Sequence, residues 1–213
     1  MALVLLPFAA SVTAQEKSPF EDEIVAFEKA DKTTPPVKGG IVFVGSSSIR
    51  RWESLKRDFL GRNVINRGFG GSAVSDSVRN ADRIVTPYAP KMIVFFAGTN
   101  DIAGGKSAEA VAADYRAFVE KVRAKLPKVP VVFLSITPAP SRQDKWPEFR
   151  KANAMIQAYS ATDPNLFYVD VYDQMLTDKG GPRPELFVED QLHMNIHGYA
   201  IWRKALIKRL PQM

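Results

Sequence analysis

The 213-residue sequence contains no cysteine and only two histidines. The absence of cysteine excludes disulfide bonds, thiol nucleophiles and cysteine-ligated zinc or iron–sulfur sites. The other residues show no spacing typical of a metal-ligand set, so we expect neither a metal nor another cofactor. Internal repeats and low-complexity segments are also missing, and 46% hydrophobic with 24% charged residues is typical of one folded domain.

A strong excess of one charge sign is missing as well. The chain carries 29 basic and 23 acidic side chains, for a net charge of +6, and its basic runs, such as Arg50-Arg51, are no longer than two residues. A basic chain could in principle favour polyanions. No DNA- or RNA-binding motif accompanies the charge, so we expect no nucleic-acid partner.

The apolar run at the N-terminus is too short to cross a membrane. Residues 1–14, MALVLLPFAASVTA, hold an apolar stretch of roughly ten residues, whereas a membrane-spanning helix needs roughly 20. Val12-Thr13-Ala14 has the small-residue pattern that signal peptidase cleaves. We therefore predict a signal peptide over residues 1–14, a secreted or periplasmic protein, and no stable membrane insertion. The segment has no Lys or Arg, and the alternative is a buried terminal element.

Residues 15–38 are predicted to form an N-terminal helix and a linker. The sequence Ser18-Pro19-x-Glu21 offers an N-cap, a proline at the first helical position and a capping-box glutamate. Apolar residues follow at helical spacing, namely Phe20, Ile24 and Phe27. The helix should end before the Thr-Thr-Pro-Pro sequence at 33–36.

Short apolar runs predict five strands after the linker. They cover residues 41–44, 64–65, 92–97, 131–136 and 166–171. Because polar and apolar residues do not alternate within them, the runs are typical of a parallel sheet covered by helices on both faces. Helical apolar patterns cover 107–126, 147–160 and 195–210. We therefore predict one α/β domain over residues 39–213, a three-layer, flavodoxin-like fold with a five-stranded parallel sheet of order 2-1-3-4-5.

Chemically useful residues follow the ends of these strands. Three serines follow Gly45 at 46–48, glycines occur in NRGFGGS at 66–72, AGTND occupies 97–101, and EDQLHMNIHGY occupies 189–199. In open α/β sheets, binding sites lie at the carboxyl ends of the strands. A hydroxyl, backbone N–H donors at glycine, an amide, and an acid near an imidazole are the groups that acyl transfer requires.

Only His193 and His197 could activate a serine through an imidazole. Asp190 lies three residues before His193, near enough to orient its ring, and His197 has no acid at a comparable spacing. Either histidine taken alone is more often structural. The spacing does not choose among the serines at 46–48, which could also cap a helix or cradle a phosphate.

Four sequence blocks together resemble the GDSL/SGNH hydrolases, a family of serine esterases and lipases. The blocks are Gly45-Ser46-Ser47, Gly70-Gly71, Gly98-Thr99-Asn100-Asp101 and Asp190-x-x-His193. The resemblance implies that Ser47 is the nucleophile and that Asp190 and His193 complete a catalytic triad. It assigns the oxyanion hole to the Ser47 N–H, the Gly71 N–H and the Asn100 side chain. Ser46 stands where the family has aspartate, outside the triad.

Several neighbouring residues have two interpretations each. Asp101 is expected to cap or brace its loop rather than to act directly. Three residues, Trp146, Phe149 and Asn153, either line the acyl or leaving-group site or pack a helix start in the core. Arginines near the strand ends, Arg50, Arg51 and Arg67, either favour an anionic substrate or belong to a solvated surface.

The sequence therefore predicts an exported serine esterase that removes short, acetyl-type acyl groups from a small-molecule or glycan ester. Because no long apolar lid segment is evident, short acyl groups are favoured. The alternatives are a lysophospholipase or thioesterase acting on longer chains, a catalytically silent carbohydrate-binding relative, and a flavodoxin-like nucleotide binder. The sequence makes no prediction about oligomeric state.

Overall fold

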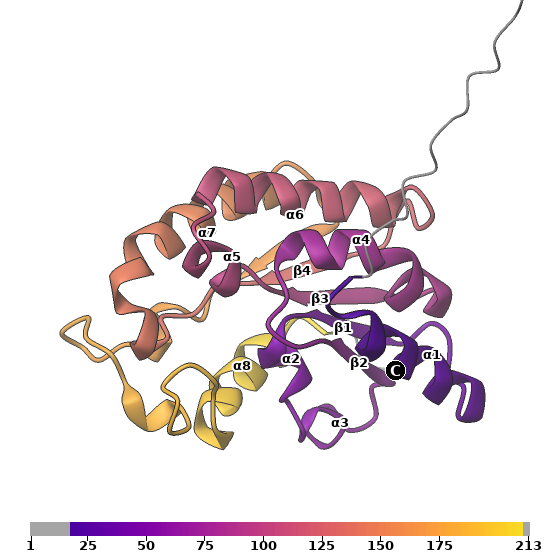
Figure 1. The fold of residues 1–213 in the computed structure, drawn as a ribbon, viewed down its shortest axis with the longest axis horizontal. Helices are drawn as coiled ribbons and strands as arrows, with labels where there is room; N and C mark the ends of the chain where they lie inside the picture. The colour runs from indigo at the N-terminus through magenta and orange to yellow at the C-terminus, as the bar shows by residue number, and fades with distance from the viewer. Residues whose placement is uncertain (1–17, 211–213) are drawn as a thin grey trace, which may run out of the picture.

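The computed structural model describes residues 18–210, and Figure 1 shows how their helices and strands are arranged. The predicted signal peptide at 1–14 lies outside the described residues and stays a prediction. The first described helix, α1 (Glu21–Thr33), falls within the predicted N-terminal segment 15–38. Among the helices of residues 18–210, none is both long and apolar enough to span a membrane.

Five parallel strands form a single sheet at the centre of the molecule. They are β1 (Ile41–Gly45), β2 (Val64–Gly68), β3 (Met92–Phe96), β4 (Val131–Leu134) and β5 (Leu166–Val169). Their order is β2-β1-β3-β4-β5 and all four pairings are parallel, which confirms the predicted fold class and strand order. Every residue of β1, β3 and β4 is buried, as the unbroken apolar runs predicted.

Seven further helices complete the layers. They are α2 (Ser47–Arg50), α3 (Leu55–Asp58), α4 (Val74–Ile84), α5 (Thr99–Ala103), α6 (Ala108–Arg123), α7 (Trp146–Ser160) and α8 (Ile196–Ile207). Short 3₁₀ segments occur at Thr86–Tyr88, Pro140–Lys145, Asp173–Met175 and Pro184–Leu186. The long helices match the predicted 107–126, 147–160 and 195–210 apart from their ends.

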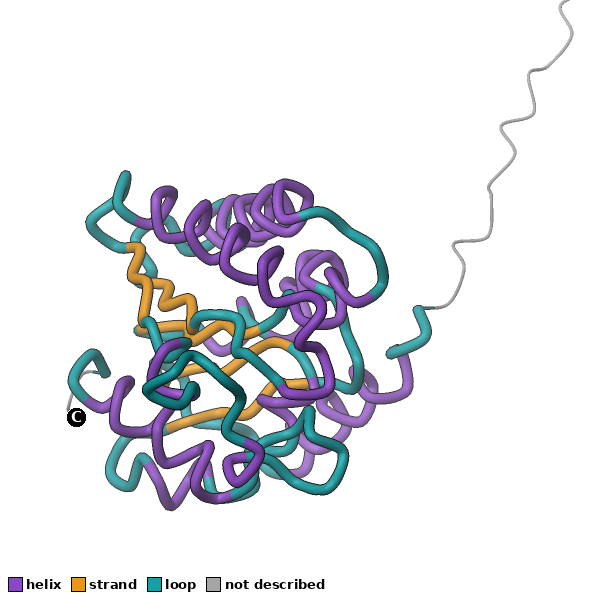
Figure 2. Tube along the Cα trace, turned by 90° about the vertical axis from the view of Figure 1, so that its left-hand side faces the viewer, coloured by secondary structure: helices purple, strands orange, loops and turns teal. Residues whose placement is uncertain are grey.

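Two hydrophobic cores separate these layers, one on each face of the sheet. The first packs α1, α4, α6 and α7 against one set of strand side chains, and the second packs α2, α3 and α8 against the other. Neighbouring residues of β1 divide between them, since Val42 enters the first core and Phe43 enters the second. Figure 2, turned by 90°, shows the strands passing between helices. The three-layer prediction is therefore confirmed.

Candidate active site

The turn from β1 to α2 places Ser47 at the carboxyl end of the sheet. Gly45 has φ +138°, and a Cβ there would lie 1.8 Å from the carbonyl oxygen of Phe96. Only glycine fits that approach. The Ser46 N–H donates to the same oxygen at 2.9 Å, and Ser47 is the first residue of α2.

Ser47, His193 and Asp190 form a continuous hydrogen-bonded chain. The Ser47 hydroxyl donates to His193 Nε2 at 2.8 Å, and His193 Nδ1–H donates to Asp190 Oδ2 at 2.6 Å. Acceptance by Asp190 leaves Nε2 as the ring nitrogen that can take a proton from serine. The structure thus brings together the three residues predicted for a triad, although 146 positions separate Ser47 from His193.

The other histidine lies elsewhere. His197 is exposed in the first turn of α8, where its backbone N–H donates to the capping side chain of Asn195 at 2.9 Å. The hydrogen-bonded chain that starts at Ser47 runs through His193 and does not include His197. The geometry selects His193, which the histidine count alone left open.

Hydrogen bonds hold the Asp190 carboxylate in its ionised form. Partial burial opposes ionisation, but the backbone N–H and ring of His193 and the backbone N–H of Leu192 donate to it and lower the pKa of Asp190 to about 2. Both backbone N–H groups reach Oδ1 at 2.9 Å, which leaves Oδ2 for the imidazole. Arg51 Nη1 lies 3.5 Å from Oδ2. The aspartate is therefore a fixed anion that orients the ring.

Two of the predicted oxyanion donors, the Ser47 N–H and the Asn100 side chain, belong to residues that line one depression. The Ser47 N–H begins α2 and so has no acceptor within its own helix. Asn100 Nδ2 donates to the carbonyl of Ser72 at 3.2 Å, which engages one of its two amide hydrogens. Gly71, with φ +29°, lies in the turn just before Ser72.

A small depression of about 10 Å³ lies beside the serine. Its lining residues are Ser46, Ser47, Ser48, Thr99, Asn100, Thr137, Ala139 and Leu192. Asn100 and Ser47 thus share one surface, whereas Gly71 is not part of the lining. The sequence analysis missed Thr137, Ala139 and Leu192. The first two follow β4, so the rule that sites lie at strand ends could have identified them.

Asp101 connects the segments on either side of the site through buried hydrogen bonds. Its carboxylate is buried, accepts from the Val74 N–H at 3.1 Å with both oxygens, and accepts from Lys106 Nζ at 3.0 Å. Burial raises the pKa of Asp101, and the hydrogen bonds from Lys106 and Val74 oppose that rise. Asp101 joins α5, which carries Asn100, to the start of α4 after the glycine turn. This bracing matches the interpretation favoured from the sequence.

Trp146, Phe149 and Asn153 belong to the core. Phe149 is fully buried, and Trp146 Nε1 donates to the carbonyl of Ala139 at 3.0 Å. Asn153 Oδ1 accepts from the Ile136 N–H at 2.8 Å and its Nδ2 donates to the Ile136 carbonyl at 2.9 Å. They support the segment that lines the depression without lining it themselves.

Arg67 matches neither interpretation offered for it, because it is neither solvated nor part of the lining beside Ser47. Only 8% of the residue is exposed. Its guanidinium pairs with Asp31 of α1 and donates to the Tyr88 hydroxyl at 2.7 Å. The partners lie 36 and 21 positions away, so local sequence could not reveal them. Arg50 pairs with Glu23 at 3.0 Å.

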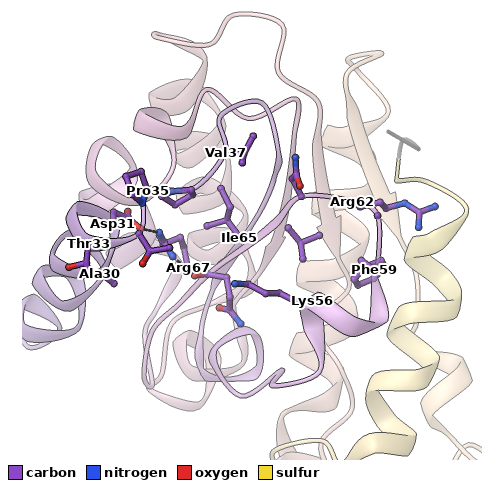
Figure 3. Close-up of a pocket in the computed structure, with 16 residues that line it drawn as sticks. Ala30, Asp31, Thr33, Pro35, Val37, Lys56, Phe59, Arg62, Ile65 and Arg67 are labelled. Atoms are coloured by element: carbon purple, nitrogen blue, oxygen red, sulfur yellow. Dashed lines mark hydrogen bonds and ion pairs between the residues drawn. The ribbon is translucent and has the colours of Figure 1, made fainter.

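A larger hollow of about 1110 Å³ lies away from this site, beside β2 at the edge of the sheet. Figure 3 shows Pro35 and Val37 from the linker on one side and Phe59 and Arg62, which precede β2, on the other. Its lining includes none of Ser47, Asp190 and His193. The size of a hollow therefore does not indicate where the hydrogen-bonded Ser47, His193 and Asp190 lie. Residues 18–210 contain no group of three or more His, Asp or Glu side chains placed to hold a metal ion.

Residues 38–201 match the model of the GDSL-like lipase/acylhydrolase family. The chain belongs to this family. The match covers well over half of the 213 residues, and it makes the protein a carboxylic ester hydrolase, as the sequence blocks predicted.

Curated relatives and solved structures agree with this assignment. The chain is 26% identical over 171 residues to human platelet-activating factor acetylhydrolase IB subunit alpha1, covering 78% of this chain and 73% of the relative. It is 27% identical over 183 residues to the human alpha2 subunit, covering 81% and 76%. A GDSL-like lipase from Bacteroides thetaiotaomicron shares the fold, with TM-score 0.75, 21% identity, and coverage of 87% and 96%.

Proposed function

We propose that this acylhydrolase is a serine esterase in which Ser47 is the nucleophile, His193 the general base and Asp190 the residue that orients the imidazole. One observation carries the proposal, namely the hydrogen-bonded chain from Ser47 Oγ to His193 Nε2 at 2.8 Å and from Nδ1 to Asp190 at 2.6 Å. A hydroxyl, a base and an oriented acid in this order are the arrangement that activates serine in unrelated hydrolases.

The reaction proceeds by acylation and deacylation. Ser47 Oγ attacks the ester carbonyl carbon while its proton passes to His193 Nε2, and the carbonyl oxygen becomes an oxyanion. The imidazolium then protonates the leaving alcohol as the ester C–O bond breaks, which leaves an acyl-serine. Water, deprotonated by His193, attacks the acyl-serine, and the carboxylic acid leaves as Ser47 recovers its proton.

Three donors are proposed to stabilise the oxyanion: the Ser47 N–H, the Gly71 N–H and the Asn100 side-chain amide. The bond from Asn100 to Ser72 at 3.2 Å fixes the amide beside the depression and leaves its second hydrogen for the substrate. Donors held in place before the reaction stabilise developing charge without reorganisation.

Asn100→Ala is expected to lower kcat by about a hundredfold with little change in KM, because the lost donor acts on the transition state. Asn100→Asp serves as the isosteric comparison. It keeps the side-chain shape but replaces the donor by an anion, so it should lose at least as much. Initial rates with p-nitrophenyl acetate measure both variants. Kinetics in which only KM rises would remove Asn100 from the oxyanion hole.

Short acyl groups, of the acetyl type, are the proposed substrates, carried on a small molecule or a glycan. No long apolar lid segment is evident in the sequence, which favours small acyl groups. The curated relatives are named acetylhydrolases, which supports the same acyl size. Export through residues 1–14 is part of the proposal and rests on the sequence alone.

Comparison of p-nitrophenyl acetate with p-nitrophenyl octanoate tests the substrate class. We expect kcat/KM for acetate to exceed that for octanoate by at least about tenfold, because an acyl site sized for an acetyl group excludes the longer chain and one surplus methylene alone costs about tenfold or more. Ser47→Ala provides the blank for both esters. A preference for octanoate would be compatible with Ser47 as the nucleophile, but it would contradict the proposal of short acyl groups and favour longer acyl chains.

A further inference from the structure

The helix α1 lies before the segment matched by the family model, yet it contacts the turn that precedes Gly71 and the last residue of α2. Its Glu23 carboxylate accepts from the backbone N–H of Gly70 with both oxygens, at 3.0 and 3.1 Å. The same carboxylate accepts from Arg50 Nη1 at 3.0 Å. Bonds in which one partner is ionised are about twice as strong as neutral ones.

Each of these two partners lies close in the chain to a residue with a proposed catalytic role. Gly70 precedes Gly71, whose N–H is a proposed oxyanion donor. Arg50 is the last residue of α2, and Ser47 is its first. One carboxylate therefore links the glycine turn to the helix that carries the nucleophile, although Glu23 is 47 positions from Gly70 and 27 from Arg50.

Packing fixes Glu23 against the turn. The Phe20 ring, just before α1, meets Phe69 edge to face with centroids 5.4 Å apart, and Ile24 is fully buried in the core. A Cβ at position 70 would lie 2.8 Å from Glu23 Oε1 and 2.9 Å from Arg50 Nη1. The carboxylate thus sits directly against the backbone that it binds.

We propose that Glu23 is a positioning residue that holds the Gly70-Gly71 turn in register with Ser47. The proposal rests on the proposed function, because the turn matters only if Gly71 donates to the oxyanion. Without the carboxylate, the Gly70 N–H loses its acceptor and the turn is free to shift. Donors to the oxyanion act in the transition state, so the consequence is a slower chemical step rather than weaker substrate binding.

The test uses p-nitrophenyl acetate kinetics and melting temperatures of full-length variants. Glu23→Ala should lower kcat by about tenfold with KM within about twofold, a smaller loss than removal of a donor because the donor is displaced rather than deleted. Glu23→Gln keeps an oxygen that can accept from Gly70 and should remain within about threefold of the wild-type kcat.

Glu28→Gln is the matched control. Glu28 lies on the same helix, and its carboxylate accepts from Arg83 Nε of α4 at 2.7 Å. This substitution removes an ion pair between α1 and α4. It leaves the contacts of Glu23 with Gly70 and Arg50 unchanged. It should therefore keep the wild-type kcat even if its melting temperature falls as far as that of Glu23→Ala.

Ser47→Ala, measured in parallel, separates the two proposals. An active Ser47→Ala enzyme would overturn the proposed function itself. An inactive Ser47→Ala enzyme together with a wild-type kcat for Glu23→Ala would overturn only the positioning role. An equal loss of kcat in Glu28→Gln would also overturn it, because α1 would then act through general stability. If Glu23→Ala does not fold, Glu23→Asp, which withdraws the charge by one methylene, should show the same drop in kcat.

Discussion

Ser47→Ala is expected to lower kcat for p-nitrophenyl acetate by roughly 10⁴- to 10⁶-fold, the range typical when a triad nucleophile is removed. The hydroxyl that donates to His193 Nε2 at 2.8 Å is then gone, and no acyl-enzyme can form. Residual turnover would come from water activated by the imidazole and from the oxyanion donors. The variant should fold normally, because Ser47 makes no other side-chain hydrogen bond within the described part of the chain.

Ser48→Ala gives the matched comparison in the same turn. The Ser48 carbonyl accepts from the Tyr199 hydroxyl at 2.9 Å, a bond that substitution of the side chain leaves intact. We expect Ser48→Ala to stay within about tenfold of the wild-type kcat, since no change is made to the triad. Loss of activity in Ser48→Ala with retention in Ser47→Ala would show that Ser48, and not Ser47, is the nucleophile.

Asp190→Asn should lower kcat by roughly 10³- to 10⁴-fold, because an amide no longer holds the imidazole in the tautomer that accepts the serine proton. In the wild type the pKa of Asp190 is about 2, lowered by hydrogen bonds from His193 and Leu192 against the effect of burial. A lowered pKa keeps the carboxylate charged at all pH values above that range. Asp190 should therefore contribute no step to the acid limb of the wild-type kcat/KM profile above that range.

Glu189→Gln tests whether any lost charge in this loop has the same effect. Glu189 is the exposed neighbour of Asp190. Within the described part of the chain, the imidazole of His193 bonds to Ser47 and Asp190 and not to Glu189, whose substitution changes the net charge equally. We expect a wild-type kcat and an unchanged pH profile. A similar loss in both variants would mean that the loop acts through its charge rather than through the bond at 2.6 Å. A wild-type acid limb that follows two protons would contradict a permanently ionised aspartate.

The parts of the site that follow local rules could be predicted from the sequence. Apolar runs without alternation identified the buried parallel strands, and the glycine after the first run marked the turn that places Ser47 at the carboxyl end of the sheet. The short distance along the chain between Asp190 and His193 made their pairing visible. The choice of Ser47 over its serine neighbours needed the family resemblance, because all three have the same chemistry.

The parts that depend on distant partners could not be predicted. Arg67 is buried because Asp31 and Tyr88 surround it, and Glu23 reaches Gly70 across 47 positions. The spacing of apolar residues along the sequence does not predict such contacts, because they form only when folding brings α1 beside β2. The short helices α3 and α5 were missed for a related reason, since four or five residues are too few to show a helical repeat. The longer helix α4 was missed as well.

The most direct test of the central claim is to locate the adduct that a fluorophosphonate forms with the protein, by mass spectrometry of its peptides. The account predicts one covalent adduct, on Ser47, that disappears in Ser47→Ala and forms much more slowly in Asp190→Asn. Phosphonates react with serines activated by a neighbouring base, so the label reports activation rather than exposure. An adduct on another residue, or no adduct on an enzyme that hydrolyses p-nitrophenyl acetate, would contradict the assignment of Ser47 as the nucleophile.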